Sequence, residues 1–490
     1  MILCIDIGTS VLKVGLFDRR ARLLHQEGCE VPRAATGGSG AYEIEPESWI
    51  RAFESALAGL PRRQLRRTGA VVISGNGPTI VPLDARGRAL HPAVTWMDHR
   101  GVEESGEIIR SRGIRVDPSF FLARAYWFRR HRPDLYEKTG CFLGCPEFLA
   151  RHLCGTSVAI LPNERFQPYY WTREAIEALD MDPDRFPPFV PTGETIGGLR
   201  RDVAADLDLP ADVPIVAGGP DYLMSLLGTG VIEPGMTCDR AGTSEGINHC
   251  STRFVDDSRL LSLPHIVGDH YSVAGVISTS GKAIQWFRAF SGYGSDVERF
   301  FRDVGEAAAG AGRLVFLPYL AGERSPVWDP DARGVFAGLA LSLSRREMAR
   351  AVAESVGFAM RDVVEVIEEH GFSVGDLRVA GGLSRVPILN RIKADITGRR
   401  VLLPEVAESE LMGDACVGLV VLGEHASPAE ASSACVRIGG TVDPDATNRA
   451  LYDELFGVYR SLYRRMRPLF RELRAMEAER LDPSGGISYP

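Results

Sequence analysis

The chain opens on two short apolar runs separated by a polar turn. Residues 2–7 (ILCIDI) and 12–17 (LKVGLF) flank the turn Gly8-Thr9-Ser10. Apolar runs of this length bounded by turn residues predict buried strands, so the pattern predicts a β-hairpin. Asp6 interrupts the first run, and a buried strand avoids an ionised carboxylate unless another group compensates its charge. The sequence therefore predicts a compensating partner for Asp6.

Further along the chain, buried strands alternate with glycine turns and helices. Residues 70–74 (AVVIS) predict another strand, and VPIVAGGPDYLMSLLG predicts a strand, a turn and a helix that starts near Tyr222. A long amphipathic helix is predicted from about Ser344 to His370, and a further one over about 410–423. Strands that alternate with helices predict the α/β class.

At 490 residues the chain is long enough for two sizeable cores. We expect one domain over 1–232 and a second over 233–490, with the boundary at Glu233-Pro234-Gly235. The second half begins with RAGTSEG, which repeats the Gly-Thr-Ser of the opening hairpin. This short match is weak evidence of an internal duplication.

Composition narrows the range of partners. The chain has 45% apolar and 24% charged residues, a net charge of −8 and a pI near 5.8. This acidic balance argues against a nucleic acid or an anionic membrane as partner. The nine cysteines follow no regular framework, and we expect a cytoplasmic protein.

The two Gly-Thr-Ser turns are candidate phosphate sites. Such turns direct backbone N–H groups and hydroxyls toward one point, where they can bind phosphate oxygens. Gly8-Thr9-Ser10 and Gly242-Thr243-Ser244, facing each other across a cleft, would hold a polyphosphate from both sides. Asp6 would then face Mg²⁺, directly or through water, because Mg²⁺ prefers a carboxylate together with waters and phosphates.

Seven segments in order carry a resemblance to a known family. They are DIGTSVLKVGLFD, EIEPESW, ISGNGPTIVPLD with PAVTWMDHR, GGPDYLMSLLGTG, AGTSEG, LPYLAGERSPVWDPDARGVFAGL and VAGGLSRVPILNRIKADITGRRV. In this order and over nearly the whole length, the chain resembles the FGGY family of carbohydrate kinases, within the actin-like ATPase superfamily. The resemblance implies two ribonuclease-H-like domains beside a deep cleft, with ATP mainly on the second domain and the sugar mainly on the first.

The resemblance also implies roles for single residues. Asp221 corresponds to the general base that takes the proton of the attacking hydroxyl, although an aspartate here is also suited to cap the following helix. Asp6 corresponds to the carboxylate linked to Mg²⁺. The residues that correspond to nucleotide contacts are Thr9, Ser10, Lys13, Gly242, Thr243, Gly281, Gln285, Gly381 and Gly382.

The sugar half departs from the family's patterns. The residues placed as sugar contacts are Asn76, Gly77, Trp96, Asp98, Asp221 and Tyr222. Glycerol kinases have an Arg-Glu pair where this chain has Gly77-Pro78, which argues against glycerol, and the Met-His contact of xylulokinases is missing as well. Trp96 and Asp98 sit as in xylulokinase-like members.

The leading hypothesis is therefore a xylulokinase-like kinase for a terminal hydroxyl of a ketose or polyol. The alternatives are a kinase for ribulose, a deoxyketose or erythritol, and a non-catalytic nucleotide-binding sensor of the same fold. A homodimer is expected from the family alone. Glu245, which directly follows the second Gly-Thr-Ser, is expected to add a negative charge near the phosphates.

Overall fold

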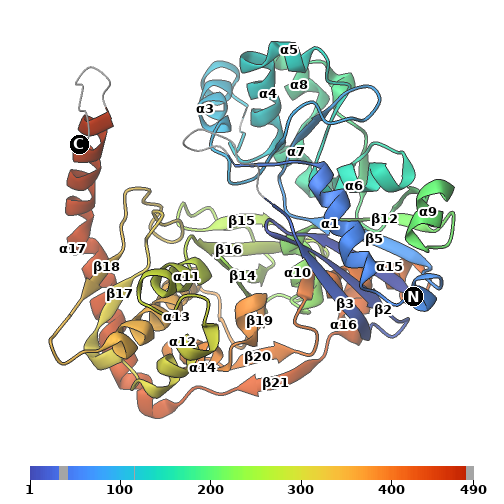
Figure 1. Cartoon of the computed structure of the whole chain (residues 1–490). Helices are drawn as coiled ribbons and strands as arrows, with labels where there is room; N and C mark the ends of the chain where they lie inside the picture. Colours follow the sequence, from blue (N-terminus) through green and yellow to red (C-terminus); the bar gives the residue numbers. More distant parts are fainter. Residues whose placement is uncertain (33–41, 115, 482–490) are drawn as a thin grey trace. The chain divides into compact units, whose positions relative to one another are not determined.

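The predicted hairpin opens the first sheet. In the computed structural model, which describes residues 1–32, 42–114 and 116–481, β1 (Ile2–Ile7) pairs antiparallel with β2 (Val11–Phe17). β3 (Leu23–Glu30) extends the meander, and β5 (Ala70–Gly75) and β12 (Pro214–Pro220) lie parallel to β1 on its other side. β11 (Thr195–Gly198) completes a six-stranded sheet in the order β11-β12-β5-β1-β2-β3 (Figure 1).

Helices cover both faces of this sheet. On β1, the side chains of Leu3, Ile5 and Ile7 join a core with Trp49 and Phe53 of α1. Successive side chains of a strand point to opposite faces, so Asp6 faces away from this core. On that second face, α15 packs against β1, β5 and α10.

The remaining elements around the first sheet are short. The helices are α1 (Glu47–Ala58), α2 (Arg62–Leu65), α3 (Gly101–Arg112), α4 (Phe121–His131), α5 (Pro133–Tyr136), α6 (Cys145–Cys154), α7 (Gln167–Tyr170), α8 (Arg173–Ala178), α9 (Arg201–Leu207), α10 (Asp221–Gly228), α15 (Ser409–Val421) and α16 (Pro428–Cys435). The minor strands are β4 (Glu43–Ile44), β6 (Val81–Leu83), β7 (Ala93–Val94), β8 (Cys141–Leu143), β9 (Ala159–Leu161) and β10 (Phe189–Pro191).

A second, seven-stranded sheet has the order β15-β16-β14-β13-β19-β20-β21 (Figure 1). Its strands are β13 (Thr237–Ala241), β14 (Glu245–Ser251), β15 (Leu261–Pro264), β16 (Tyr271–Ile277), β19 (Leu377–Ala380), β20 (Val401–Pro404) and β21 (Ile438–Val442). The other elements of this part are β17 (Val315–Leu317), β18 (Val335–Ala337), α11 (Gly281–Phe290), α12 (Val297–Glu306), α13 (Arg345–Glu369), α14 (Pro387–Thr397) and α17 (Arg449–Leu481).

The two sheets share one plan. In each, an antiparallel meander (β1-β2-β3; β13-β14-β16) lies beside two strands parallel to its first strand (β5, β12; β19, β20). An antiparallel edge strand comes next in space; it precedes β12 in the chain in the first sheet (β11) and follows β20 in the second (β21). The α/β class is confirmed. The repeat of strand order supports the duplication that the two Gly-Thr-Ser turns suggested.

The chain packs as two compact units, and each unit is built from more than one segment of the chain. One unit comprises Met1–Ile232, Ile266–Gly268 and Glu408–Val436, and the other comprises the rest from Glu233 onward. The expected division into 1–232 and 233–490 placed Glu408–Val436 in the second domain, whereas this segment packs in the first unit. The reason is that α15 is buried along nearly its whole length against β1, β5 and α10. Among the described residues, none of the helices is both long and apolar enough to cross a membrane.

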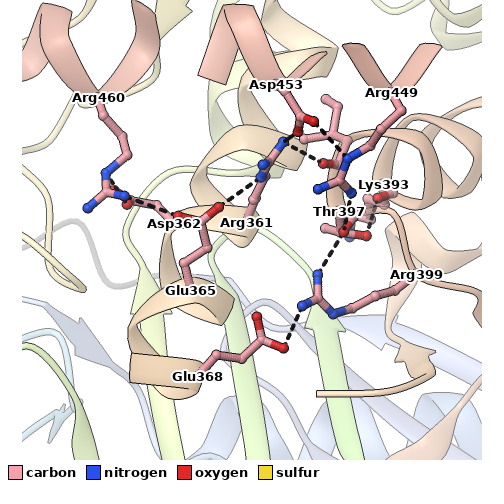
Figure 2. Close-up of polar contacts among 11 residues, drawn as sticks. Arg361, Asp362, Glu365, Glu368, Lys393, Thr397, Arg399, Arg449, Asp453 and Arg460 are labelled. Atoms are coloured by element: carbon pink, nitrogen blue, oxygen red, sulfur yellow. Dashed lines mark hydrogen bonds and ion pairs between the residues drawn. The ribbon is translucent and has the colours of Figure 1, made fainter. Parts of the chain in front are cut away.

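Ion pairs and a hydrogen bond join three helices of the second unit. Arg361 of α13 reaches Asp453 of α17 at 2.7 Å, and Arg460 of α17 reaches Glu365 of α13 at 3.0 Å. Arg449 of α17 also donates to the carbonyl of Thr397 at the end of α14. Figure 2 shows these contacts between residues of α13, α14 and α17. The hydrogen bond to Thr397 anchors α14 at its C-terminal end.

Candidate active site

The turn of the first hairpin is bonded to a predicted sugar contact. Trp96 Nε1 donates to Thr9 Oγ1 at 3.1 Å. Ser10 is exposed, and its carbonyl accepts a hydrogen bond from Val31 N at 2.9 Å. The structure therefore brings together Thr9 and Trp96, which the sequence had assigned separately to nucleotide and sugar.

Asp6 and Lys13 face each other across the β1–β2 ladder. Lys13 Nζ lies 2.5 Å from Glu408 Oε2, just before α15. Burial opposes the charge of Lys13, but Glu410, Asp6 and Glu408 together raise its pKa. For Asp6, burial and then the charge of Glu410 hold the pKa well above its usual range.

The surroundings of Asp6 fit a divalent cation. Asp6 is 3% exposed, and its Oδ1 has no hydrogen-bond partner among the described residues. The nearby charges of Glu410 and Asp221 also oppose its ionisation, so a cation would stabilise the ionised form. Within the described ranges no three His, Cys, Asp or Glu side chains form a metal-binding group. The donor set therefore suits an ion such as Mg²⁺ that takes its other ligands from water and phosphate.

Asp221 is the first residue of α10, directly after β12. Its Oδ1 accepts a hydrogen bond from Tyr222 N at 2.6 Å, and a carboxylate at this end of a helix is favoured by the helix dipole. The N-cap position is Pro220, so Asp221 occupies the first helical position. Asp221 and Tyr222 are both half-buried. The charge of Asp221 raises the pKa of Asp6, so the two carboxylates lie near each other.

Close backbone contact between α10 and α15 fixes this arrangement. A Cβ at Gly228 would lie 1.8 Å from Ser409 O, and a Cβ at Gly413 would lie 2.1 Å from Met224 O. Only glycine permits such an approach. These contacts join the C-terminal half of α10 to the first turns of α15, and both Asp221 and Glu410 lie close enough to Asp6 to raise its pKa.

The side-chain amide of Asn76, in the loop after β5, is already hydrogen-bonded within the protein. Asn76 is buried, and its Nδ2 donates to Ile7 O at 2.8 Å while its Oδ1 accepts from Thr79 at 3.0 Å. Asn76, Gly77 and Thr79 line a cavity of about 20 Å³, which has room for about one water molecule. The structure thus gives Asn76 a loop-shaping role, and a sugar hydroxyl would have to share its amide.

The same cavity contains Glu147, which sequence analysis missed. Glu147 lies in the first turn of α6, and its Oε1 accepts from Ile160 N at 2.9 Å. Its Oε2 has no partner among the described residues, and burial raises the pKa of the carboxyl to about 7. The available signal was an acidic residue within the otherwise apolar segment FLGCPEFLA.

Asp98 is already saturated with donors. It accepts two hydrogen bonds from the Arg100 guanidinium, at 2.9 and 2.8 Å, and one from Tyr42 N at 2.8 Å. Burial alone would raise the pKa of Asp98, but these hydrogen bonds hold it below the usual value. Arg100, which also pairs with Glu43 at 2.6 Å, is a further residue that sequence analysis missed.

In the second unit, the turn after β13 is bonded to the start of α11. Gly281 N donates to Gly242 O at 3.0 Å, and Lys282 N donates to Thr243 O at 3.1 Å. Gln285 is exposed one helical turn after Gly281. Three of the predicted nucleotide contacts, Gly242, Thr243 and Gly281, are therefore neighbours.

The turn after β19 approaches the same place. Gly381 has φ +81°, and a Cβ there would lie 2.5 Å from Ala241 O. Gly382, which begins a 3₁₀ turn over Gly382–Arg385, is exposed. Because β13 and β19 are parallel neighbours, Gly242 and Gly381 lie at the same edge of the sheet.

Glu245 directly follows the second Gly-Thr-Ser turn, and its carboxylate is buried and paired with Lys393. It is 1% exposed, its Oε1 lies 2.6 Å from Lys393 Nζ, and its Oε2 accepts from Ser280 Oγ. Lys393 was missed, although a lysine between the apolar residues Ile392 and Ile396 of one helix was a visible signal.

Comparison with known proteins identifies the family. The N-terminal domain of the FGGY family of carbohydrate kinases matches residues 1–228, and its C-terminal domain matches residues 240–422. The chain is 27% identical over 493 residues to a xylulose kinase of Escherichia coli (strain K12), covering 96% of this chain and 100% of the relative. It is 26% identical over 450 residues to a gluconokinase of Bacillus subtilis (strain 168), covering 86% of this chain and 87% of the relative.

A solved structure agrees with this result. The xylulose kinase from Rhodospirillum rubrum superposes with a TM-score of 0.81 at 25% identity, over 96% of this chain and 99% of that one. The matched family domains lie in the order that the sequence motifs predicted, and together they span most of the chain. The chain belongs to the FGGY family of carbohydrate kinases.

Proposed function

We propose that this carbohydrate kinase transfers the γ-phosphoryl group of ATP to a terminal hydroxyl of a ketose or polyol, with xylulose as the first candidate. The full-length match to proteins named xylulose kinase supports this substrate class. The gluconokinase relative is nearly as similar, so the sugar must be decided by assay.

The position of Asp221 carries the proposal. It starts α10 with a carboxylate that is half-buried and held by Tyr222 N. In phosphoryl transfer most of the catalysis is positioning, and a carboxylate within hydrogen-bond reach of the attacking hydroxyl can accept its proton. Asp221 is the proposed acceptor of that proton, and Tyr222 the neighbouring sugar contact.

The nucleotide contacts are proposed for both units. The first unit contributes Thr9, Ser10 and Lys13, and Asp6 would hold Mg²⁺, directly or through water. The second unit contributes Gly242, Thr243, Gly281, Gln285, Gly381 and Gly382. Bound Mg²⁺ would offset the negative charge of the phosphate oxygens.

The sugar contacts are proposed for the first unit. Trp96 offers its indole face to the carbon atoms of the sugar. Asn76, Gly77 and Asp98 are the proposed contacts of the sugar hydroxyls. Since Asp98 is bonded to Arg100, we add the Arg100 guanidinium as a donor for sugar hydroxyls.

An assay of ADP formation over a panel of substrates tests the proposal. The panel holds xylulose, ribulose, a deoxyketose, erythritol, gluconate and glycerol, each measured against the ATPase background without sugar. We expect the highest kcat/KM for a ketose or polyol other than glycerol. A preference for gluconate would contradict the proposed substrate class, and ATP binding without turnover on any compound would favour a nucleotide sensor.

A further inference from the structure

We propose that Lys393 is a positioning residue for the second Gly-Thr-Ser turn, because it binds the two carboxylates that flank this turn. The inference rests on the proposed function, in which Gly242 and Thr243 contact the phosphates of ATP.

One ammonium group joins the two strands that carry the turn. β13 brings Asp239 to one side of the turn, and β14 begins with Glu245 on the other. Lys393 Nζ lies 2.5 Å from Asp239 Oδ2 and 2.6 Å from Glu245 Oε1. All three side chains are at most 1% exposed. The ammonium group of Lys393 therefore links β13 and β14 below the turn, in addition to the backbone ladder between the two strands.

Glu245 extends the contact to the start of α11. Its Oε2 accepts from Ser280 Oγ, and Ser280 N in turn donates to Thr243 O at 3.2 Å. The next residue, Gly281, donates to Gly242 O. The turn, the start of α11 and Lys393 thus form one continuous set of hydrogen bonds.

The cluster also sets the charge beneath the turn. Burial, and then the charge of Glu245, hold the pKa of Asp239 well above its usual range. Burial opposes ionisation of Glu245 too, but Lys393 lowers the pKa of Glu245 below its usual value. Lys393 thus faces two buried carboxyl groups, and its ammonium group offsets negative charge beneath the turn. Loss of the ammonium would leave uncompensated negative charge next to a site for polyphosphate, which repels it.

The helix that carries Lys393 is anchored by further hydrogen bonds at its C-terminal end. Thr397 Oγ1 donates to Lys393 O at 2.7 Å, one turn further along α14. The carbonyl of Thr397 accepts hydrogen bonds from Arg399 and Arg449. Figure 2 shows Lys393 beside Thr397, next to the arginines that anchor this end of α14. The ammonium group therefore projects from a fixed helix.

The test compares Lys393→Met with the double variant Lys393→Met/Glu245→Gln. We expect the single variant to raise the Kd for ATP, measured by isothermal titration calorimetry, and the KM for ATP by about 10-fold. The KM for the sugar should stay within about 2-fold. The double variant removes the unpaired charge and should return the Kd for ATP to within about 3-fold of the wild type.

A matched control breaks another buried ion pair of the same unit. Arg350 lies 2.7 Å from Glu354, and both are at most 5% exposed. Arg350 otherwise bonds Val304 O and Tyr452. Arg350→Met should lower the melting temperature without changing the KM for ATP.

A second comparison covers the case in which Lys393→Met does not fold. Lys393→Met/Asp239→Asn keeps the Glu245 carboxylate next to the turn, whereas Lys393→Met/Glu245→Gln does not. The first double variant should bind ATP about 10-fold more weakly than the second.

Four outcomes overturn the inference. They are an unchanged Kd for ATP in Lys393→Met, no recovery in the double variant, equal ATP affinity of the two double variants, and an equal rise in KM for Arg350→Met. In all four the wild type still binds ATP and turns over, so the proposed function stands. A wild type that binds no ATP overturns the proposed function and this inference together.

Discussion

Asp6 is a buried carboxyl group whose surroundings suit a bound cation. The carboxyl group lies in one of the two middle strands of a six-stranded sheet covered on both faces. Lys13, which lies opposite Asp6, also contacts Glu408. Glu410 and Asp221 add negative charge nearby. A cation that binds Asp6 would therefore relieve a cost already present in the fold.

Replacing Asp221 tests the catalytic assignment. Asp221→Asn keeps the shape of the side chain and the oxygen that accepts from Tyr222 N, but it is a far weaker proton acceptor. We expect kcat to fall by about 10²–10⁴-fold. The Kd for ATP, measured by calorimetry, should stay within about 3-fold. A variant with wild-type turnover would show that another group accepts the proton.

Glu147 makes the stability of the protein depend on pH. Its pKa is raised by burial from 4.5 to about 7, so the folded state binds this proton more tightly than the unfolded state. The stabilisation is complete below pH 4.5 and is lost as the pH rises to 7, by about 3 kcal/mol. Glu147→Gln should remove this fall in the free energy of unfolding, measured by urea denaturation at several pH values.

Glu323 provides the matched control for Glu147. It is also buried, with a pKa raised by burial to about 7, but it lies in the second unit. Glu323→Gln should flatten the pH profile of stability in a similar way. If the Glu147→Gln profile parallels that of the wild type, Glu147 does not titrate in this range.

Local pattern located some site residues and not others. The position of Asp6 in a buried strand was predictable, because the apolar run and its polar exception are adjacent in sequence. The partner of Glu245 was not, because Lys393 is far away in the chain and only the folding of α14 onto β13 and β14 joins them. For the same reason, the bonds that occupy Asp98 and Asn76 were not predictable.

At the level of elements, two glycines allow α10 and α15 to touch along their backbones. Gly228 and Gly413 are each within reach of a carbonyl on the other helix. This contact sets where Asp221 lies relative to Glu408 and Glu410. The chemistry at the end of the sheet therefore depends on residues that contact no substrate.

Gly413→Ala tests this dependence. The new methyl group would overlap Met224 O and force the helices apart, so we expect a loss of about 2–4 kcal/mol in the free energy of unfolding and a lower kcat. The control is Gly305→Ala in α12, where an added Cβ meets no atom within 4 Å. It should be neutral or stabilise the protein by up to about 1 kcal/mol. Equal effects of both substitutions would argue against the packing explanation.

The ends of a helix were predictable from the sequence where its capping residues were clear. The long helix begins after Ser344, whose hydroxyl and the side chain of Glu347 form a capping box, and a helix from about Ser344 was predicted. The helix expected over about 410–423 is α15, Ser409–Val421. Its packing in the first unit was not predictable, because an apolar helix carries no signal of which sheet it covers.

At the scale of the molecule, the proposed nucleotide contacts are divided between two separately packed units. The proposed phosphoryl transfer has to exclude water from the γ-phosphate, so we expect the units to close when the ligands bind. We expect the radius of gyration, measured by small-angle X-ray scattering, to decrease with sugar and a non-hydrolysable ATP analogue together. Neither ligand alone should give the full change. No compaction with both ligands would contradict closure.

The return of Glu408–Val436 to the first unit has a consequence for biosynthesis. The ribosome has to make more than four hundred residues before the sheet that holds Asp6 can receive α15. Until then, a nascent chain exposes one apolar face of that sheet, a surface prone to aggregation and to capture by chaperones. The amino-terminal half of this enzyme is thus the first to be translated and among the last to be completed.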